Sequence, residues 1–182
     1  MSTTRATFNL TATALLIGVS IAIPLFMPKI AIEPMSFTLA SHVAIFIAMF
    51  ISPAMAVAVV LGATVGFFFS GLPLVVMLRA ASHIFFALAG SYYIAKHSEV
   101  LNSPRDTHIF SFALALIHAI GEMIVVSFFY FGGSYQEHNF FRVVILLVGL
   151  GSIVHSMIDY EIAWVVFQGL SRQKSLASYI RK

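Results

Sequence analysis

Long apolar runs separated by short polar stretches are the dominant pattern of the chain. Most runs approach the roughly 20 residues of helix that cross a bilayer core. Several end at proline, which cannot continue a helix ladder and pushes the residue before it out of helical geometry. The pattern predicts an all-α integral membrane protein with six transmembrane helices, over residues 10–27, 38–52, 54–69, 73–95, 109–131 and 140–170, and a loop over 28–37.

Composition supports the same class of protein. The chain is 60% hydrophobic and only 9% charged, whereas an average soluble domain is about 45–50% apolar and about 25% charged. We find no internal repeat or linker, so residues 1–182 are expected to form a single membrane domain. The apolar run after Arg5 is longer than the core of a signal peptide and lacks a clear cleavage site, so it is assigned to the first helix. The absence of cysteine excludes disulfides and thiolate metal sites.

The placement of positive charge predicts the orientation. Six crossings put both termini on one side, and lysine and arginine near span ends favour the cytoplasmic side. The side that holds the termini would carry seven such residues and the other side two, Lys29 and Arg142. The seven are Arg5, Lys96, Arg105, Arg172, Lys174, Arg181 and Lys182. Both termini are therefore predicted to be cytoplasmic, in a multi-pass protein of the cell membrane; the family resemblance given below implies that this is a prokaryotic plasma membrane.

Arg79 interrupts the fourth predicted span. A charge at the centre of a membrane helix costs about 2.5–3.5 kcal/mol on insertion scales, so something must offset it. Arg79 could reach the outer headgroups or pair with a carboxylate on another helix. It could instead face a water-filled pocket and bind an anionic solute group, because its forked donors match a carboxylate.

Histidine and acidic residues recur at helical spacing on three spans. His83 follows Arg79 by one turn, and His118 precedes Glu122 by one turn, so each pair shares a helix face. Glu122 is the natural partner for Arg79, because both would lie in the outer half of the membrane. The sixth span repeats the spacing with His155 and Asp159. Since ionisable residues in membrane helices rarely face lipid, the set predicts an interior site.

His42 begins the second span beside other polar and aromatic residues. With Ser36, Phe37, Thr38 and Ser41 it could form the rim of a pocket. The alternative is an ordinary helix start, with Ser36 or Thr38 as the N-cap.

Small residues recur every four positions on two spans. Ala14, Gly18 and Ala22 form a stripe on the first span, a pattern that lets membrane helices approach closely. The stripe could serve packing within the chain or docking of another subunit. Gly62 and Gly66 on the third span have the same spacing, and there we expect internal packing.

Catalytic and nucleotide-binding motifs are missing from the sequence. It has no Walker lysine loop, HExxH or GxSxG motif, so the chain is not expected to be an enzyme or to use ATP by itself. Two alternatives stay open. One is an intramembrane metalloenzyme with His118, Glu122, His155 and Asp159 as metal ligands; the other is a stand-alone proton-coupled carrier, although no inverted repeat supports it.

Two segments carry a family resemblance, PKIAIEPMSFTLASHVAIFIAMFISP and GATVGFFFSGLPLVVMLRAASHIFFALAG. The chain resembles the substrate-binding S components of energy-coupling factor (ECF) vitamin transporters, and these segments look like the members assigned to niacin, called NiaX. The resemblance implies capture of a small vitamin from outside. It also implies association with the transmembrane coupling subunit EcfT and two cytosolic ATPases, which use the ATP. No cofactor, bound metal or nucleic acid partner is expected for this chain.

The resemblance also suggests roles for the singled-out residues. In the family an AxxxA pattern on the first helix docks onto the coupling subunit, and Ala14, Gly18 and Ala22 occupy the matching stripe. Niacin, as nicotinate, is a small aromatic carboxylate that Arg79 could bind. The predicted substrate site comprises Arg79, His83, His118, Glu122, His42, Phe37, Phe86, Tyr130 and Asp159: His83 or His118 could bind the ring nitrogen, and Phe37, Phe86 or Tyr130 could stack on the ring. Pantothenate or a pyridoxine-type vitamin could use the same groups.

Overall fold

Helices make up most of the chain in the computed structural model, which describes residues 3–32 and 35–173. The predicted basic positions Lys174, Arg181 and Lys182 lie outside this part. The helices are α1 (Thr3–Phe26), α2 (Val43–Ile51), α3 (Pro53–Phe69), α4 (Leu74–Ser82), α5 (Ile84–Lys96), α6 (Pro104–Phe131) and α7 (Gly151–Arg172). A 3₁₀-helix, η1 (Ser98–Leu101), and a π-helix, η2 (Phe141–Leu150), precede α6 and α7, and two short strands are β1 (Lys29–Ile32) and β2 (Met35–Thr38).

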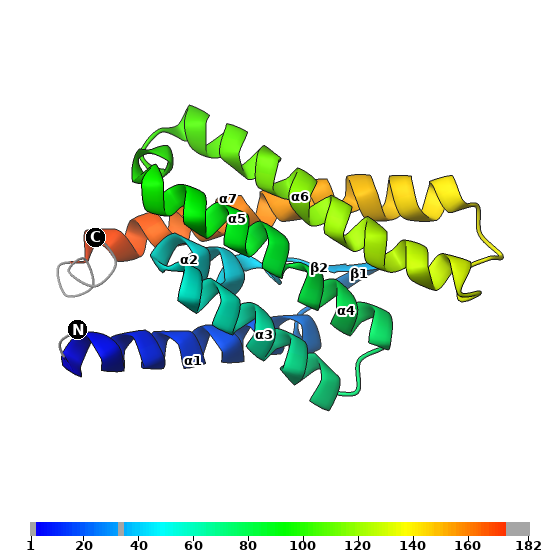
Figure 1. Ribbon diagram of the computed structural model, residues 1–182, viewed down its shortest axis with the longest axis horizontal. Helices are drawn as coiled ribbons and strands as arrows, with labels where there is room; N and C mark the ends of the chain where they lie inside the picture. Colours follow the sequence, from blue (N-terminus) through cyan, green and yellow to red (C-terminus); the bar gives the residue numbers. More distant parts are fainter. Residues whose placement is uncertain (1–2, 33–34, 174–182) are drawn as a thin grey trace.

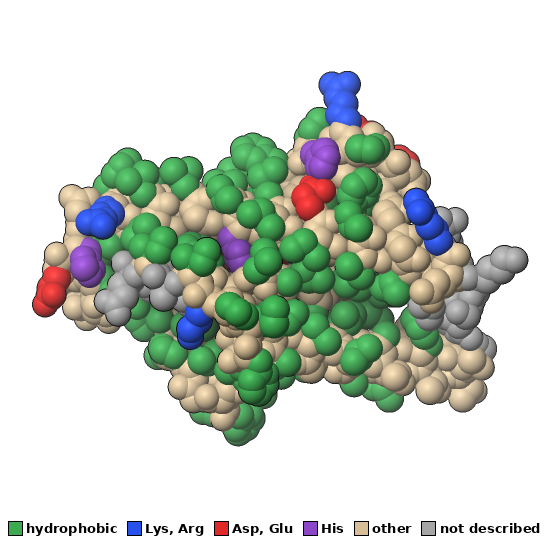
Figure 2. Space-filling view, turned by 180° about the vertical axis from the view of Figure 1, so that it is seen from behind, with side chains coloured by type: hydrophobic (Ala, Val, Ile, Leu, Met, Phe, Trp, Pro, Cys, Tyr) green, Lys and Arg blue, Asp and Glu red, His purple; other side chains and the backbone are tan. Residues whose placement is uncertain are grey.

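Within residues 3–32 and 35–173, four helical stretches are long and apolar enough to cross a membrane: Thr3–Phe26, Leu74–Lys96, Pro104–Phe131 and Phe141–Arg172. Helix α3 has 17 residues and α2 has 9. At a rise of 1.5 Å per residue, α2 is only about 13 Å long, less than half of a bilayer core of about 30 Å. Figure 2 shows hydrophobic side chains over much of one face, with only a few charged side chains among them. The prediction of a helical membrane protein is thus confirmed, whereas six full crossings stay a prediction.

Helix α2 lies at the centre of the bundle. Every residue from Val43 to Phe50 is buried, as expected of a helix that is apolar on all sides. Phe46 and Phe50 contact the Tyr160 ring of α7, with centroids 5.2 and 5.4 Å apart. The predicted second span began at residue 38, but α2 begins after His42. Neither Ser36 nor Thr38 is therefore its N-cap, and that interpretation was wrong.

The segment predicted to be a loop over 28–37 contains a β-hairpin. Strands β1 and β2 pair antiparallel, with Lys29 opposite Thr38 and Ile30 opposite Phe37. The prediction of an irregular loop was wrong because β1, with the sequence KIAI, has strand-forming isoleucines and a partner strand a few residues away. The hairpin connects α1 to α2 beside the middle of the bundle (Figure 1).

The fourth predicted span is broken at His83, between α4 and α5. The His83 N–H donates to the carbonyl of Ala80 at 3.2 Å, a 3₁₀-type bond, and the Ser82 hydroxyl donates to the carbonyl of Arg79 at 2.7 Å. Such local side-chain bonds compete with the helix ladder. The break places His83 at a junction of two helices, where its side chain is buried.

Helix α1 packs closely on α3 through glycine. A Cβ at Gly62 would lie 2.7 Å from the Ile17 side chain, and one at Gly66 would clash with Ile21. The expected internal packing of Gly62 and Gly66 is therefore confirmed. Gly18, by contrast, has nothing within 4 Å of its Cβ position, and Ala14 is exposed. Ala14 and Gly18 therefore face away from the rest of the described chain, whereas Ala22 is half-buried.

Helix α1 begins and α7 ends at the same end of the molecule (Figure 1). The turns from α5 to α6 lie at this end too, whereas the α3–α4 and α6–η2 connections lie at the opposite end. The cavity described next lies towards the end of the molecule that holds the α3–α4 and α6–η2 connections.

Candidate solute-binding site

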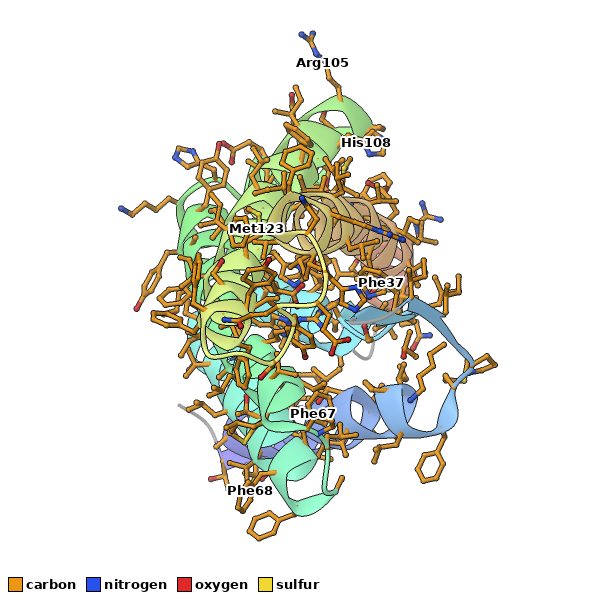
Figure 3. All side chains as sticks on the ribbon, turned by 90° about the vertical axis from the view of Figure 1, so that its right-hand side faces the viewer. Phe37, Phe67, Phe68, Arg105, His108 and Met123 are labelled. Carbon is orange, nitrogen blue, oxygen red and sulfur yellow. The ribbon has the colours of Figure 1, made fainter. Side chains whose placement is uncertain are left out.

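A cavity of about 370 Å³ lies between the hairpin, α1–α4, α6 and α7. Its volume is within the range of about 300–1,000 Å³ that is typical of small-molecule sites. Both apolar and polar side chains line its wall. The polar and aromatic lining consists of Ser20, Lys29, Phe37, Thr38, Ser41, His42, Phe67, Arg79, His83, Glu122, Tyr135 and His155. Figure 3 views the molecule from this end, with Phe37 on the hairpin and Phe67 on α3.

Arg79 and Glu122 form a two-pronged ion pair at the wall of the cavity. Arg79 Nε lies 3.1 Å from Glu122 Oε1, and an Arg79 terminal nitrogen lies 3.0 Å from Oε2. The Ser152 hydroxyl also donates to Oε2. The predicted pairing of Arg79 with Glu122 is confirmed. A guanidinium has five N–H donors, and in the described chain only two of them have acceptors, so Arg79 retains donors beside the cavity.

Three histidines meet next to this ion pair, each from a different part of the chain. His42 precedes α2, His83 lies at the α4–α5 break and His118 lies on α6. Their ring centroids are 4.7 Å apart in all three combinations. Phe86 packs beneath them, with its centroid 4.9 Å from that of His118, and is fully buried. The sequence placed these residues on different spans, and the fold brings them together.

Asp159 holds the turn that carries His42. Its carboxylate accepts the backbone N–H of Ala40 at 2.7 Å and that of His42 at 2.9 Å. It also lies 2.9 Å from His42 Nδ1. Asp159 is fully buried and does not line the cavity. It acts on the site through His42 and the start of α2, where a negative charge is favourable.

His155 lies between Asp159 and the cavity. Its Nε2 is 3.0 Å from the Ser41 hydroxyl and 3.4 Å from Asp159 Oδ2. Its ring centroid lies 5.5 Å from that of Phe37. The predicted pair of His155 and Asp159 therefore continues the polar cluster from α7 to the hairpin.

The structure does not bring all the predicted residues to the cavity wall. His118 and Phe86 lie behind His42 and His83 as a second layer. Tyr130 lies near the end of α6, where its hydroxyl donates to the carbonyl of His138 at 2.8 Å and its ring packs on Phe140. It is not among the cavity-lining residues.

Sequence reasoning missed several lining residues. Lys29 was used only as a surface charge, and Tyr135 was part of a predicted loop. Ser152, which supports Glu122, lies at the start of α7 and follows Glu122 by 30 residues. No spacing signal connects these residues to the site, because the hairpin positions Lys29, the α6–η2 connection positions Tyr135 and α7 positions Ser152.

These features define a class: a helical membrane protein that holds among its helices a solute-sized cavity lined in part by ionisable side chains. No protein-family model and no solved structure matches the chain. Over 157 residues it is 41% identical to the niacin transporter NiaX of Lactococcus lactis subsp. cremoris, covering 85% of this chain and 71% of that protein. The chain belongs to the NiaX family of niacin transporters.

Proposed function

We propose that the protein binds niacin, as nicotinate, in the cavity lined by Arg79 and His83. The observation that carries this is the unused guanidinium donors of Arg79 at the cavity wall, on a chain related to a niacin transporter. Glu122 fixes the orientation of the guanidinium, and the remaining N–H groups are available to a carboxylate. Imidazole nitrogens of His83 or His42 are suitable partners for the pyridine nitrogen.

The ring of the solute needs an apolar surface. Phe37 and Phe67 both line the cavity, and we propose that one or both pack against the pyridine ring. Lys29 adds a second cation to the lining, which favours entry of an anion. Neither pantothenate nor a pyridoxine-type vitamin combines a flat ring with a directly attached carboxylate, so nicotinate fits this set better.

Nicotinate and nicotinamide together test the role of Arg79. Removing a charged partner from a buried pair commonly costs about 2–5 kcal/mol, so Arg79→Ala should weaken nicotinate binding by roughly 30-fold or more. Nicotinamide has no carboxylate to pair with Arg79, so its affinity should change much less. The matched control is Arg142→Ala, which removes an exposed cation. Equal loss for both compounds, or unchanged nicotinate affinity, would refute the assignment.

We also propose that the protein is an ECF S component, coupled to EcfT and two ATPases. Ala14 and Gly18 are exposed, and no described residue lies within 4 Å of the Gly18 Cβ position, which supports docking of a partner helix on the stripe of Ala14, Gly18 and Ala22. Gly18→Leu should reduce copurification with EcfT and leave nicotinate binding intact. Ala113→Leu, which enlarges an exposed alanine on α6, is the control. Nicotinate uptake by vesicles that contain this chain alone would instead favour a self-contained carrier.

The orientation follows from charge. Arg5, Lys96, Arg105 and Arg172 lie at helix ends on the side where α1 begins, whereas Lys29 and Arg142 lie on the cavity side. We propose that the first side is cytoplasmic and that the cavity opens outward, with six crossings overall. Labelling of single cysteines placed at Ser98 and Ser134, in intact cells, tests this.

A further inference from the structure

The three imidazoles next to the cavity form a nearly equilateral triangle. Besides the common centroid separation of 4.7 Å, the rings of His42, His83 and His118 lie edge to face, at interplanar angles of 68–86°. One ring nitrogen of each lies within 4.8 Å of those of the other two. Nitrogens on a common zinc ion, with bonds of about 2.0–2.1 Å, lie about 3.4 Å apart. Small side-chain movements would therefore bring all three onto one ion.

His118 lacks the partners that a buried imidazole normally has. It is 1% exposed, and neither its Nδ1 nor its Nε2 has a hydrogen bond to another of the residues that the structure describes. The nearby carboxylate oxygen, Glu122 Oε1, is 3.5 Å from Nε2 and already accepts a bond from Arg79. Buried polar groups without partners are rare and need an explanation. A metal ion that accepts the lone pair of a His118 nitrogen would explain the missing hydrogen bonds.

His42 is arranged as metal-binding histidines are. Its Nδ1 faces the Asp159 carboxylate at 2.9 Å, which leaves Nε2 free as the ligand atom. A carboxylate behind the imidazole fixes the ring and raises its basicity, and this arrangement is common in metal sites. Asp159 is in turn held by backbone N–H groups, so the support is rigid.

The charge of the surroundings also favours a cation. Glu122 and Asp159 carry two negative charges beside the histidines, and Arg79 carries one positive charge. With neutral imidazoles the buried cluster therefore has a net charge of −1. A proton on one histidine would offset this charge, and so would a metal ion.

We propose that His42, His83 and His118 bind a divalent transition metal that prefers imidazole, such as Zn²⁺, Co²⁺ or Ni²⁺. His42 and His83 line the cavity, whereas His118 closes the site from behind. Three protein ligands leave a fourth position, which opens to the cavity and takes water or a solute. The metal site shares His42 and His83 with the proposed nicotinate site, but a metal titration tests it without nicotinate.

A titration with Co²⁺ tests the site, because its visible absorption reports the ligand geometry. The full chain, purified in detergent with a tag free of histidine and stripped with a chelator, should bind one equivalent and show a tetrahedral spectrum. Zn²⁺ should displace the Co²⁺. His83→Ala and His118→Ala should each weaken binding by at least tenfold, whereas His138→Ala, in the α6–η2 connection, should leave it unchanged.

His155→Ala separates this site from the neighbouring set of His42, His155 and Asp159, whose ligand atoms also lie within 4.8 Å of one another. Binding should survive this change, and its loss would overturn the assignment to His83 and His118. If an alanine variant fails to fold, the titration of the wild-type protein is sufficient. Absence of saturable Co²⁺ or Zn²⁺ binding would overturn the proposal and would mean that the imidazoles are held together by shared protons. Nicotinate binding, measured in the same stripped and loaded samples, reports separately on the proposed function.

Discussion

Asp159, on α7, accepts a hydrogen bond of 2.7 Å from the backbone N–H of Ala40, 119 residues earlier in the chain. Ala40 has a φ of +68°, in the left-handed region that is unfavourable for a residue with a Cβ. The carboxylate therefore holds a strained turn between β2 and α2. Because the same carboxylate binds His42, strain at Ala40 and the position of His42 are linked.

Substitution of Asp159 should destabilise the protein markedly. Removing one partner from a buried charged network typically costs about 3–5 kcal/mol, so we expect Asp159→Ala to lower the thermal midpoint in detergent by several degrees or more. Asp159→Asn keeps one acceptor oxygen and should lose less. Glu99→Ala, which removes an exposed carboxylate whose contact is with His97, is the control. A midpoint equal to that of wild type in Asp159→Ala would contradict the anchoring role.

Glycine at position 40 should stabilise the protein. A left-handed conformation costs an ordinary L-residue roughly 1–2 kcal/mol and glycine almost nothing, while the greater freedom of glycine in the unfolded chain offsets part of the gain. Ala40→Gly should therefore raise the thermal midpoint slightly. Ala40→Val should lower it, because a β-branched residue is disfavoured further at positive φ. If both variants behaved alike, backbone conformation would not be the cause.

The sequence predicted the helical class and the Arg79–Glu122 pair because both follow from one physical constraint. A helix that crosses a bilayer must be long and apolar, so hydropathy locates the helices. A charge inside the membrane needs a partner, so an isolated arginine and an isolated glutamate at similar depth are predicted to pair. Glu122 and Arg79 both fell in the outer half of their predicted spans, which left few other partners. Such constraints act on single helices and can be seen without knowing how the helices pack.

The same constraint could not locate the hairpin or the break at His83. The hairpin depends on contacts distant in sequence: Asp159 stabilises the turn after β2, and the hairpin lies against α7, where a Cβ at Gly151 would clash with the Phe37 ring. The break follows instead from local hydrogen bonds of Ser82 and His83, which hydropathy does not report. Apolar composition made residues 38–52 resemble a span, although only Val43–Ile51 is helical. Residues positioned by these irregular segments, Lys29 and Tyr135 among them, could not be predicted to line the cavity.

Neutralising Glu122 should make the thermal stability of the protein depend on bound nicotinate. Glu122→Gln leaves the guanidinium of Arg79 without its counter-ion, and we expect a loss of stability of about 2–5 kcal/mol. A bound carboxylate would replace the missing charge. Saturating nicotinate should therefore raise the thermal midpoint more in Glu122→Gln than in wild type, and nicotinamide should not. Equal shifts of the thermal midpoint for nicotinate and nicotinamide would mean that Arg79 does not bind the carboxylate.

Two glycines that look alike in the sequence should respond in opposite ways to alanine. Gly62 faces Ile17, whose three nearest side-chain carbons lie 2.7–2.8 Å from the Cβ position, whereas no described residue lies within 4 Å of the Gly18 Cβ position. Gly62→Ala should destabilise the α1–α3 contact by about 1–3 kcal/mol through overpacking. Gly18→Ala should be neutral or stabilise the helix by up to about 1 kcal/mol, since alanine is the better helix former.

Thermal unfolding of the two variants in detergent measures this difference, and Ile17→Ala offers a rescue. The smaller side chain makes room for the new methyl group, so Gly62→Ala combined with Ile17→Ala should lose less stability than the sum of the single changes. Additive losses would mean that α1 does not pack on α3 at Gly62. A large loss of stability in Gly18→Ala would mean that the stripe of Ala14, Gly18 and Ala22 packs inside the molecule and is not available to a partner.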